Sequence, residues 1–489
     1  MNKLESLNPA TDEVVATYDV ATDEQVFAAV DRAQETAEWW RGIGYDGRKQ
    51  RLLAWRRYLA AHSDELIDLM HRENGKPKPD ATLELLLALE HTAWSAKHAG
   101  KVLKPEKRRP GMLFANFSAR TEHVPYGVVG VIGPWNYPVY TPNGSIATAL
   151  AAGNTVVYKP SEHTPAIGQW YADAYALANP SDPDGVLTVV QGYGATGAAL
   201  CRSGVQKLAF TGSAATGKKV MAACAENLVP VVMELGGKDA AIVAADADLA
   251  KAAELVAWGA ASNGGQTCAG VERVYVEEEV RDEFLGLLTK EFANVKPGSG
   301  PGASYGPMTM PSQLEVVRKH VEDAIGSGGQ PVLGGLSSVG DRYVEPVVLV
   351  DVPEDSLAIQ EETFGPTVTV TTVRDLDEAV RLSNAVNFGL GASVFSKRRG
   401  PEIAERLDTG MVSVNSVLGF AGMGALPFGG RADSGFGRIH GPEGLREFTR
   451  PRSVAVQRFA LPGLNLTSFN RSKTIDRLLP RMLRLLHKR

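Results

Sequence analysis

The strongest constraint on the fold is an alternation of short apolar runs with helical segments, which begins near residue 120. The first block contains the strand-like runs GVVGVIG, NTVVYKP, GVLTVVQG and QKLAFTG. A second block begins near Gly236 and contains DAAIVAADAD, RVYVEEEV, TVTVTTV, GASVFS and GMVSVNS, with a helix from Leu249 to about Ser262. Strands that alternate with helices form βαβ units and parallel sheets. We therefore predict an α/β fold, and 489 residues suit two or three domains.

The first hundred residues have a different pattern, which predicts helices. Thr22 and Asp23 precede a helix that runs to Trp40, because serine, threonine and aspartate are good N-caps. A second helix is expected from about Gly47 to Asn74, where apolar residues recur at helical spacing.

Composition narrows the class of protein. The formal net charge of -5 and the pI of about 6.1 argue against a nucleic-acid binder. Three cysteines are too few for a disulfide framework, and the N-terminus has no apolar core typical of a signal peptide. No apolar run approaches the length of a membrane span. We expect a cytoplasmic protein, and the scattered cysteines and histidines predict no metal site.

Cys268 is the candidate nucleophile. It lies in SNGGQTCAG, where Gly264 and Gly265 are expected to end the preceding helix and hold the thiol at a cleft. Backbone N–H groups there would lower the pKa of the thiol and favour the thiolate. A buried hydrophobic role is commoner for a single free cysteine, and we assign that role to Cys201 and Cys224 in their alanine-rich helices.

Two further side chains are candidates for acid–base and oxyanion chemistry. Glu234 follows an apolar run in VPVVMELGGKD, and apolar neighbours would raise its pKa toward that of a general base. Asn136 lies between two prolines in GPWNYP, so its amide is held rigidly enough to stabilise an oxyanion. Considered singly, a capping glutamate and an asparagine bonded to its own turn are the more ordinary interpretations.

Two glycine-rich loops are candidates for phosphate binding. Residues 192–197 fit G-x-G-x-x-G, but no acidic residue follows at the usual distance, so we interpret this loop as structural. In AFTGSAATGKKV, a strand leads into Gly212 and Ser213 and a helix follows. The N-terminus of that helix would bind a pyrophosphate.

Eight motifs occur together: GPWNYP, YKPSEHTP, FTGSAATG, MELGGKD, NGGQTCAG, EETFGP, NFGLGASVFS and PFGGRADSGFGR. In this order they resemble the aldehyde dehydrogenase superfamily, over about Asn8 to Phe459. The resemblance implies oxidation of a small-molecule aldehyde to an acid with NAD(P), through a thioester on Cys268. It makes Glu234 the base that activates water and Asn136 an oxyanion donor. The implied cofactor contacts are Trp135, Lys159, Glu162, Gly212, Ser213, Gly217, Leu235, Glu362 and Phe364.

The resemblance also implies the domain organisation and the cofactor. We expect a Rossmann-type NAD-binding domain at 1–109 and 128–235 and a catalytic domain at 236–440. A small β oligomerisation element at 110–127 and 441–460 would form a homodimer or homotetramer. NAD is expected to be preferred to NADP because Glu162 would accept hydrogen bonds from the ribose hydroxyls and repel a 2′-phosphate.

This sequence departs from the family pattern in one place. Many members carry a tryptophan and a lysine in the helix after the PWN motif, where this chain has Gly144 and Ser145. A proton relay through that lysine is therefore in doubt, and we expect a wider substrate funnel on that side. Two alternative functions remain: a CoA-acylating dehydrogenase, which Glu234 argues against, and an inactive structural or binding member.

The last stretch, 461–489, is strongly basic and extends past the usual end of the family. Leucines and a methionine recur at helical spacing after Ile475, and Arg477, Arg481, Arg484 and Lys488 fall opposite them. Such an amphipathic helix either packs on the enzyme or another subunit, which we favour, or lies on an anionic membrane through 472–489. Pro480 is expected to kink or divide this helix.

Overall fold

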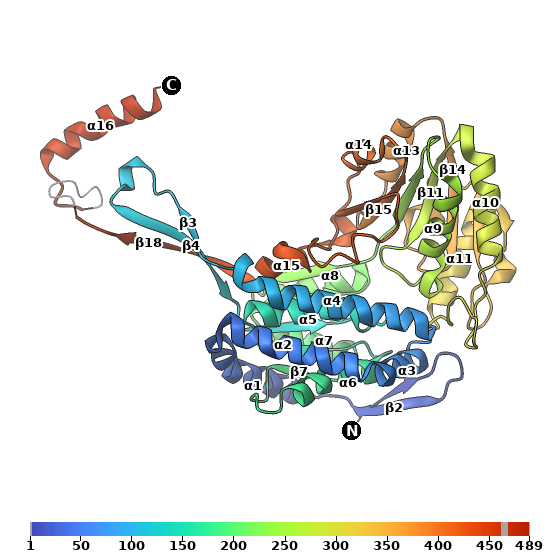
Figure 1. The fold of residues 1–489 in the computed structure, drawn as a ribbon, viewed down its shortest axis with the longest axis horizontal. Helices are drawn as coiled ribbons and strands as arrows, with labels where there is room; N and C mark the ends of the chain where they lie inside the picture. The colour runs from blue at the N-terminus through green and yellow to red at the C-terminus, as the bar shows by residue number, and fades with distance from the viewer. Residues whose placement is uncertain (1, 461–467, 489) are drawn as a thin grey trace. The chain divides into compact units, whose positions relative to one another are not determined.

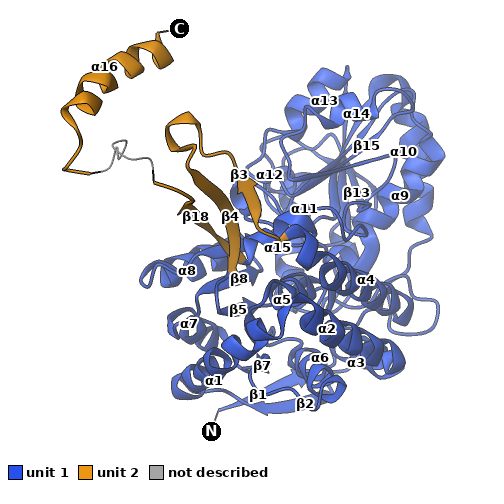
Figure 2. Cartoon of the chain, turned by 60° about the vertical axis from the view of Figure 1, so that its left-hand side comes forward, with its two compact units in different colours: residues 1–102, 125–448 blue, residues 103–124, 449–489 orange. Residues whose placement is uncertain are grey.

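The computed structural model describes residues 2–460 and 468–488. The chain forms two compact units, of which the first comprises residues 1–102 and 125–448 (Figure 2). The second comprises residues 103–124 and 449–489. The first unit contains two large, mostly parallel sheets, so the α/β prediction is confirmed.

A six-stranded sheet forms the core of the first half of the chain. Its order is β17-β9-β8-β5-β6-β7, with all neighbours parallel except β17 and β9. The strands are β5 (Val128–Ile132), β6 (Thr155–Lys159), β7 (Leu187–Val189), β8 (Lys207–Thr211), β9 (Val231–Glu234) and β17 (Gly435–Phe436). Its helices are α5 (Tyr140–Ala152), α6 (Pro165–Ala178), α7 (Gly194–Arg202) and α8 (Ala214–Ala225).

The N-terminal helices are packed around this sheet. They are α1 (Asp23–Gly42), α2 (Gly44–Ala61), α3 (Ser63–Glu73) and α4 (Lys78–Val102), preceded by the antiparallel pair β1 (Lys3–Leu7) and β2 (Val14–Asp19). Thr22 caps α1 reciprocally with Gln25, as its position predicted. The single helix expected from Gly47 to Asn74 is wrong, because His62 leaves the helical conformation between α2 and α3. Figure 1 shows α2 and α4 lying alongside each other.

A seven-stranded sheet forms the core of the second half, in the order β12-β13-β14-β11-β10-β15-β16. Its strands are β10 (Asp239–Val243), β11 (Val271–Glu277), β12 (Gln330–Leu333), β13 (Val347–Val350), β14 (Thr367–Val373), β15 (Gly391–Phe395) and β16 (Met411–Val414). Only β12 is antiparallel to its neighbour.

Helices cover both faces of this second sheet. The apolar side chains of α9 and α10 pack with those of β10, β11 and β14, and those of α13 and α14 pack with the opposite face. The helices are α9 (Leu249–Ala261), α10 (Arg281–Ala293), α11 (Gln313–Gly326), α12 (Leu357–Gln360), α13 (Leu376–Ser383) and α14 (Gly400–Ala404). The short helix α15 (Gly441–Glu447) packs instead on α4 and α5.

The second unit contains a three-stranded sheet and one helix. The sheet order is β18-β4-β3, with β3 (Glu106–Arg108) and β4 (Phe117–Pro125) antiparallel and β18 (Thr449–Gln457) beside β4. The helix is α16 (Lys473–His487). It is one continuous helix with Pro480 inside it, so the expected division is wrong. Residues 461–467 of the predicted basic tail lie outside the described part of the chain.

Candidate active site

The strand order of the six-stranded sheet determines where its ligand-binding crevice lies. The chain runs outward from β5 to β6 and β7, then returns to β8 beside β5 and continues to β9. In such sheets, ligands bind beyond the carboxyl ends of the two strands where the winding reverses. The loop after β5 carries Trp135 and Asn136, and the loop after β8 carries Gly212 and Ser213. All four residues line one cavity of about 250 Å³, and Cys268 lines it too.

The Gly212–Ser213 turn leads directly into α8. Ser213 is the N-cap, and its hydroxyl oxygen accepts a hydrogen bond of 3.3 Å from the N–H of Thr216. The first N–H groups of a helix have no helical partners and attract anions. Gly217 packs against Leu235, since a Cβ there would lie 2.7 Å from Leu235 Cδ2. The glycines therefore let α8 approach the cavity closely, and the residues present fit the pyrophosphate of a dinucleotide.

The loop before β14 supplies the opposite wall of this cavity. Glu362 accepts a 2.9 Å hydrogen bond from the N–H of Gly237, and burial raises the pKa of its carboxyl to about 8. Phe364 has a left-handed φ of 54° and meets the ring of Trp135 edge-on, 5.6 Å between centroids. The two residues predicted to position the nicotinamide ribose and ring thus lie together with Trp135.

Lys159 and Glu162 lie apart from this cavity, at the carboxyl end of β6. Lys159 is buried and donates to the carbonyl oxygen of Pro160 at 3.0 Å and to Glu162 at 3.5 Å. Burial lowers the pKa of Lys159. Burial raises the pKa of Glu162, but the charge of Lys159 and the hydrogen bonds to the carboxylate lower it by more. The pKa of Glu162 is therefore below its usual value. The loop 192–197 begins α7 and contributes no residue to the cavity.

Cys268 follows a single 3₁₀ turn, Ser262–Gly265, that ends the α9 region as the two glycines predicted. Its side chain is partly exposed. The expected lowering of its pKa is wrong. Burial raises the pKa of the thiol well above its ordinary value, and the carboxyls of Glu234, Glu362 and Asp239 raise it further. The thiol at rest is therefore protonated, and its activation needs a proton acceptor.

Glu234 is the residue whose carboxyl lies beside the Cys268 thiol. It ends β9 and is 2% exposed, and neither carboxyl oxygen makes a hydrogen bond in standard geometry within the described residues. Burial raises its pKa to about 8, and the neighbouring Cys268 thiol offsets part of that rise. A carboxyl whose pKa lies near the working pH is well matched to general base catalysis.

Asn136 is held in place by a buried network that the sequence analysis did not identify. Its Nδ2 donates to the carbonyl oxygen of Gln266 at 3.0 Å, two residues before Cys268. The backbone oxygen of Asn136 accepts from Lys76 Nζ at 3.0 Å. Lys76 forms a buried ion pair with Glu84, which in turn accepts from the backbone N–H groups of Val139 and Tyr140.

A second buried ion pair, Lys238 with Glu272, holds the loop that carries Phe364. Glu272 accepts from the N–H groups of Thr363 and Phe364, both at 2.9 Å. Lys238 is the lysine of the quoted MELGGKD motif, so its position was visible in the sequence although its role was not.

A second cavity, of about 160 Å³, meets the first at Cys268. Its wall is mostly apolar, and its charged residues are Lys76, Asp80 and Glu84. Among the residues that the structure describes, no arginine lines it. Its large apolar residues are Leu83, Leu87, Tyr137, Tyr140, Trp258, Val417, Leu418, Phe428 and Ile439.

The widening expected beside Gly144 is not found. A Cβ on Gly144 would overlap Nε2 of His440, so the imidazole ring fills the space that a larger side chain would take. His440 is buried against His91, with 3.9 Å between ring centroids. Burial holds the pKa of His440 well below its ordinary value, so the ring is neutral.

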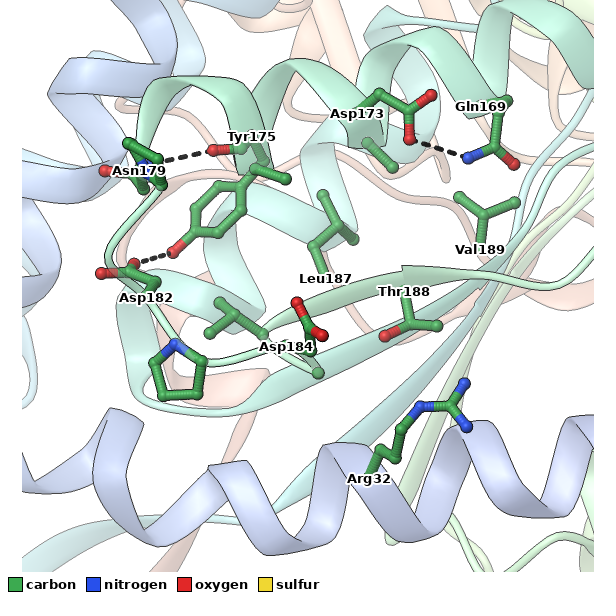
Figure 3. Close-up of a pocket in the computed structure, with 16 residues that line it drawn as sticks. Arg32, Gln169, Asp173, Tyr175, Asn179, Asp182, Asp184, Leu187, Thr188 and Val189 are labelled. Carbon is green, nitrogen blue, oxygen red and sulfur yellow. Dashed lines mark hydrogen bonds between the residues drawn. The ribbon is translucent and has the colours of Figure 1, made fainter.

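A third cavity, of about 390 Å³, lies near α6 and β7 and includes neither Cys268 nor Glu234 (Figure 3). Its polar groups bond to one another: Tyr175 donates to Asp182 at 2.9 Å, and Gln169 donates to Asp173 at 2.8 Å. In the described part of the chain, no group of three or more His, Cys, Asp and Glu side chains is placed to hold a metal ion.

This fold, with these residues at its switch point, defines the class of NAD(P)-dependent oxidoreductases. The profile described as "Aldehyde dehydrogenase family" matches residues 1–454, and the chain belongs to that family. It is 37% identical over 466 residues to the 4,4'-diapolycopene aldehyde oxidase of Methylomonas sp., covering 94% of this chain and 87% of that protein.

Solved structures agree with the family assignment. The NAD-dependent aldehyde dehydrogenase of Sinorhizobium meliloti superposes with a TM-score of 0.89 at 32% identity, covering 94% of this chain and 92% of that one. An NADP-dependent enzyme of Escherichia coli superposes with a TM-score of 0.88 at 31% identity, covering 93% and 95%. Related proteins thus include both NAD- and NADP-dependent enzymes.

Proposed function

We propose that this dehydrogenase oxidises an uncharged, apolar aldehyde to the carboxylic acid, by hydrolysis of a thioester on Cys268. The observation that carries the proposal is the meeting of two cavities at Cys268: one contains the predicted pyrophosphate turn with Glu362 and Phe364, and the other is smaller and mostly apolar. The region 1–109 and 128–235, which contains five strands of the six-stranded sheet, would bind the cofactor, and the region 236–440 would supply the nucleophile.

Each residue around Cys268 has a separate role in the proposed reaction. The Cys268 thiol loses its proton to solvent or to Glu234, and the thiolate attacks the aldehyde carbon. Asn136, with the backbone N–H of Cys268, stabilises the oxyanion, and loss of one such donor typically lowers the rate by about 10² to 10³. NAD(P), which Gly212, Ser213 and Glu362 would hold, would supply the hydride acceptor, and a thioester on Cys268 would remain. Glu234 then removes a proton from water, and the hydroxide formed releases the acid.

The substrate cavity supports an uncharged aldehyde over an anionic one. The only cation in its wall among the described residues, Lys76, is neutralised by Glu84, and Asp80 adds a further carboxyl. Burial of a substrate carboxylate there without a partner would be strongly unfavourable.

We further propose that NAD is preferred to NADP and that the chain forms a homodimer or homotetramer through its three-stranded sheet. The preference for NAD is supported by Glu162, whose carboxylate would repel a 2′-phosphate. β3 and β18 are the outer strands of this sheet, and an outer strand can pair with a strand of another subunit.

The test is a panel of straight-chain, aromatic and ω-carboxylated aldehydes with NAD and NADP, read as NADH or NADPH absorbance. We expect kcat/KM to rise with the apolar length of the aldehyde and to be lowest for ω-carboxylated aldehydes. Highest kcat/KM for a carboxylated aldehyde would overturn the substrate class. Adding CoA separates the acylating alternative: acyl-CoA as the product, in place of the free acid, would overturn the hydrolytic mechanism.

A further inference from the structure

The two units carry opposite net charges that sum to the overall charge of -5. The second unit, residues 103–124 and 449–489, contains fifteen lysines and arginines against three acids, a formal charge of +12 with histidine neutral. The first unit contains the other 36 basic and 53 acidic residues, a formal charge of -17. An anionic surface therefore attracts the second unit and repels the first.

The apolar and the cationic side chains of α16 lie on opposite faces of the helix. At about 100° per residue, its apolar side chains occupy one arc of roughly 160°. Its other side carries the cations, and its single acid, Asp476, pairs with Arg471 at 3.1 Å. Pro480 lies on this polar side, where it interrupts no apolar contact. The apolar residues are Ile475, Leu478, Leu479, Met482, Leu483, Leu485 and Leu486, and the cations are Lys473, Arg477, Arg481, Arg484 and Lys488.

Most of the apolar arc of α16 is uncovered. Leu483 is 63% exposed and Leu485 84% exposed, and only Ile475 is buried. A helix that packs on protein needs a stripe of about 100°, whereas an arc as wide as this one suits a helix half-immersed in a lipid interface. Among the described residues, no helix has the length and apolar character needed to cross a membrane. Lying on the bilayer surface is therefore the membrane interaction open to α16.

The loop between β3 and β4 combines the same two properties. A short 3₁₀ turn presents Met112, Leu113 and Phe114 to solvent, with Met112 69% exposed. A cavity of about 630 Å³ beside it has cationic side chains in its wall. Those cations are Lys107, Arg108, Arg109, Arg120 and Arg458.

We propose that the second unit is a two-part binding surface for anionic phospholipid bilayers, formed by α16 and the Met112–Phe114 loop. The apolar side chains enter the boundary between headgroups and acyl chains, and the arginines and lysines pair with lipid phosphates. Each cation near such a surface contributes about 1 kcal/mol. The family profile ends at residue 454, so α16 lies outside the matched region. If the proposed apolar substrate is also correct, this surface holds the enzyme where such aldehydes dissolve; lipid binding itself does not depend on that.

The experiment is co-sedimentation of the full chain with vesicles of phosphatidylcholine, with and without phosphatidylglycerol. The test variant is the triple substitution Arg477→Glu, Arg481→Glu, Arg484→Glu. The matched control reverses three exposed helix-surface cations of the first unit, Arg57→Glu, Lys290→Glu and Lys319→Glu. A third variant, Met112→Ser, Leu113→Ser, Phe114→Ser, tests the loop.

We expect the wild type and the control to sediment with the anionic vesicles only, and salt to weaken this binding. The α16 variant should bind at least about tenfold more weakly, and the loop variant should also bind more weakly. Failure of the wild type to sediment with anionic vesicles, or an equal loss in the control, would overturn the proposal. So would an α16 variant that binds vesicles normally but changes the mass of the oligomer, because the helix would then contact a second copy of the chain.

Discussion

Gly265 lies against the backbone of Gly365, so closely that a Cβ on Gly265 would overlap the carbonyl group of Gly365. Gly265 also has a φ of 73°, which favours glycine. The loop that precedes Cys268 and the loop that carries Phe364 therefore touch backbone to backbone. This contact therefore ties the position of the Cys268 loop to that of the Phe364 loop.

Gly265→Ala should lower kcat by at least about a hundredfold, because a shift of about 1 Å in the reacting groups has that effect. It should also weaken NAD binding, measured by fluorescence titration, because the Phe364 loop must move. Gly44→Ala is the control, with a similar φ of 69° and open space around its Cβ. Normal activity in Gly265→Ala would show that the two loops move independently.

Cys268→Ala should abolish NADH formation, whereas Cys201→Ala and Cys224→Ala should keep most of it. The reason is location: Cys201 and Cys224 are buried together in the core between α7, α8 and the sheet, away from both cavities at Cys268. Their substitution should instead lower the melting temperature, because the contacts of the buried sulfur atoms are lost. Steady turnover by Cys268→Ala would refute the thioester mechanism.

Glu234→Gln should separate acylation from deacylation. Without the base, water is not activated, so the acyl-enzyme accumulates and a burst of up to about one NADH per active site precedes very slow turnover. Rapid-mixing absorbance measures the burst, and mass spectrometry of the quenched protein detects the acyl group on Cys268. A variant that binds NAD but shows no burst would assign Glu234 to activation of the thiol as well.

The pKa of about 8 for Glu234 predicts that a rise in pH increases turnover but decreases stability. Deacylation needs the carboxylate, so turnover should rise as the pH increases through about 8, and this rise should disappear in Glu234→Gln. The stability of the fold should instead fall as the pH increases. The pKa in the folded protein lies above the ordinary glutamate value of 4.5, so the stabilising contribution of this group is complete below pH 4.5 and is lost as the pH rises through about 8.

The stability effect is measured by thermal melts of wild type and Glu234→Gln. At about pH 9 the variant should melt at least about 2 °C higher, because it buries no charge, and near pH 5 this gain should vanish. Asp239, Glu73 and Glu362 also titrate in this range, but they are common to both proteins. If the two proteins differ in melting temperature by the same amount at about pH 5 and about pH 9, the carboxyl of Glu234 has a more polar environment than burial in the structure indicates.

Glu162→Gln should raise the ratio of kcat/KM for NADP to that for NAD by about tenfold, equivalent to about 1.4 kcal/mol. Loss of the carboxylate removes the repulsion of a 2′-phosphate and frees Lys159, its partner at 3.5 Å, to attract that phosphate. The exposed Glu226→Gln in the same region is the control. An unchanged ratio would mean that other residues select the cofactor.

The sequence alone predicted most of the elements and the candidate reacting groups. Runs such as KLAF and VVME predicted β8 and β9 because apolar patterning acts locally, and the Gly264–Gly265 pair predicted the break before Cys268. The separated faces of α16 could likewise be read from residue spacing. The motif letters specified Cys268, Glu234 and Asn136 as a set, although their proximity was not visible.

Tertiary structure alone decided the environment of those groups. Asn136 meets Gln266 across 130 residues, and the pairs Lys76–Glu84 and Lys238–Glu272 join loops that local patterning cannot relate. The pKa of Cys268 was expected to fall and instead rises, because burial and the clustering of three carboxyls depend on the packed fold. His440 fills the space at Gly144 for the same reason: occupancy of a cavity is set by contacts between distant segments, which no local sequence pattern contains.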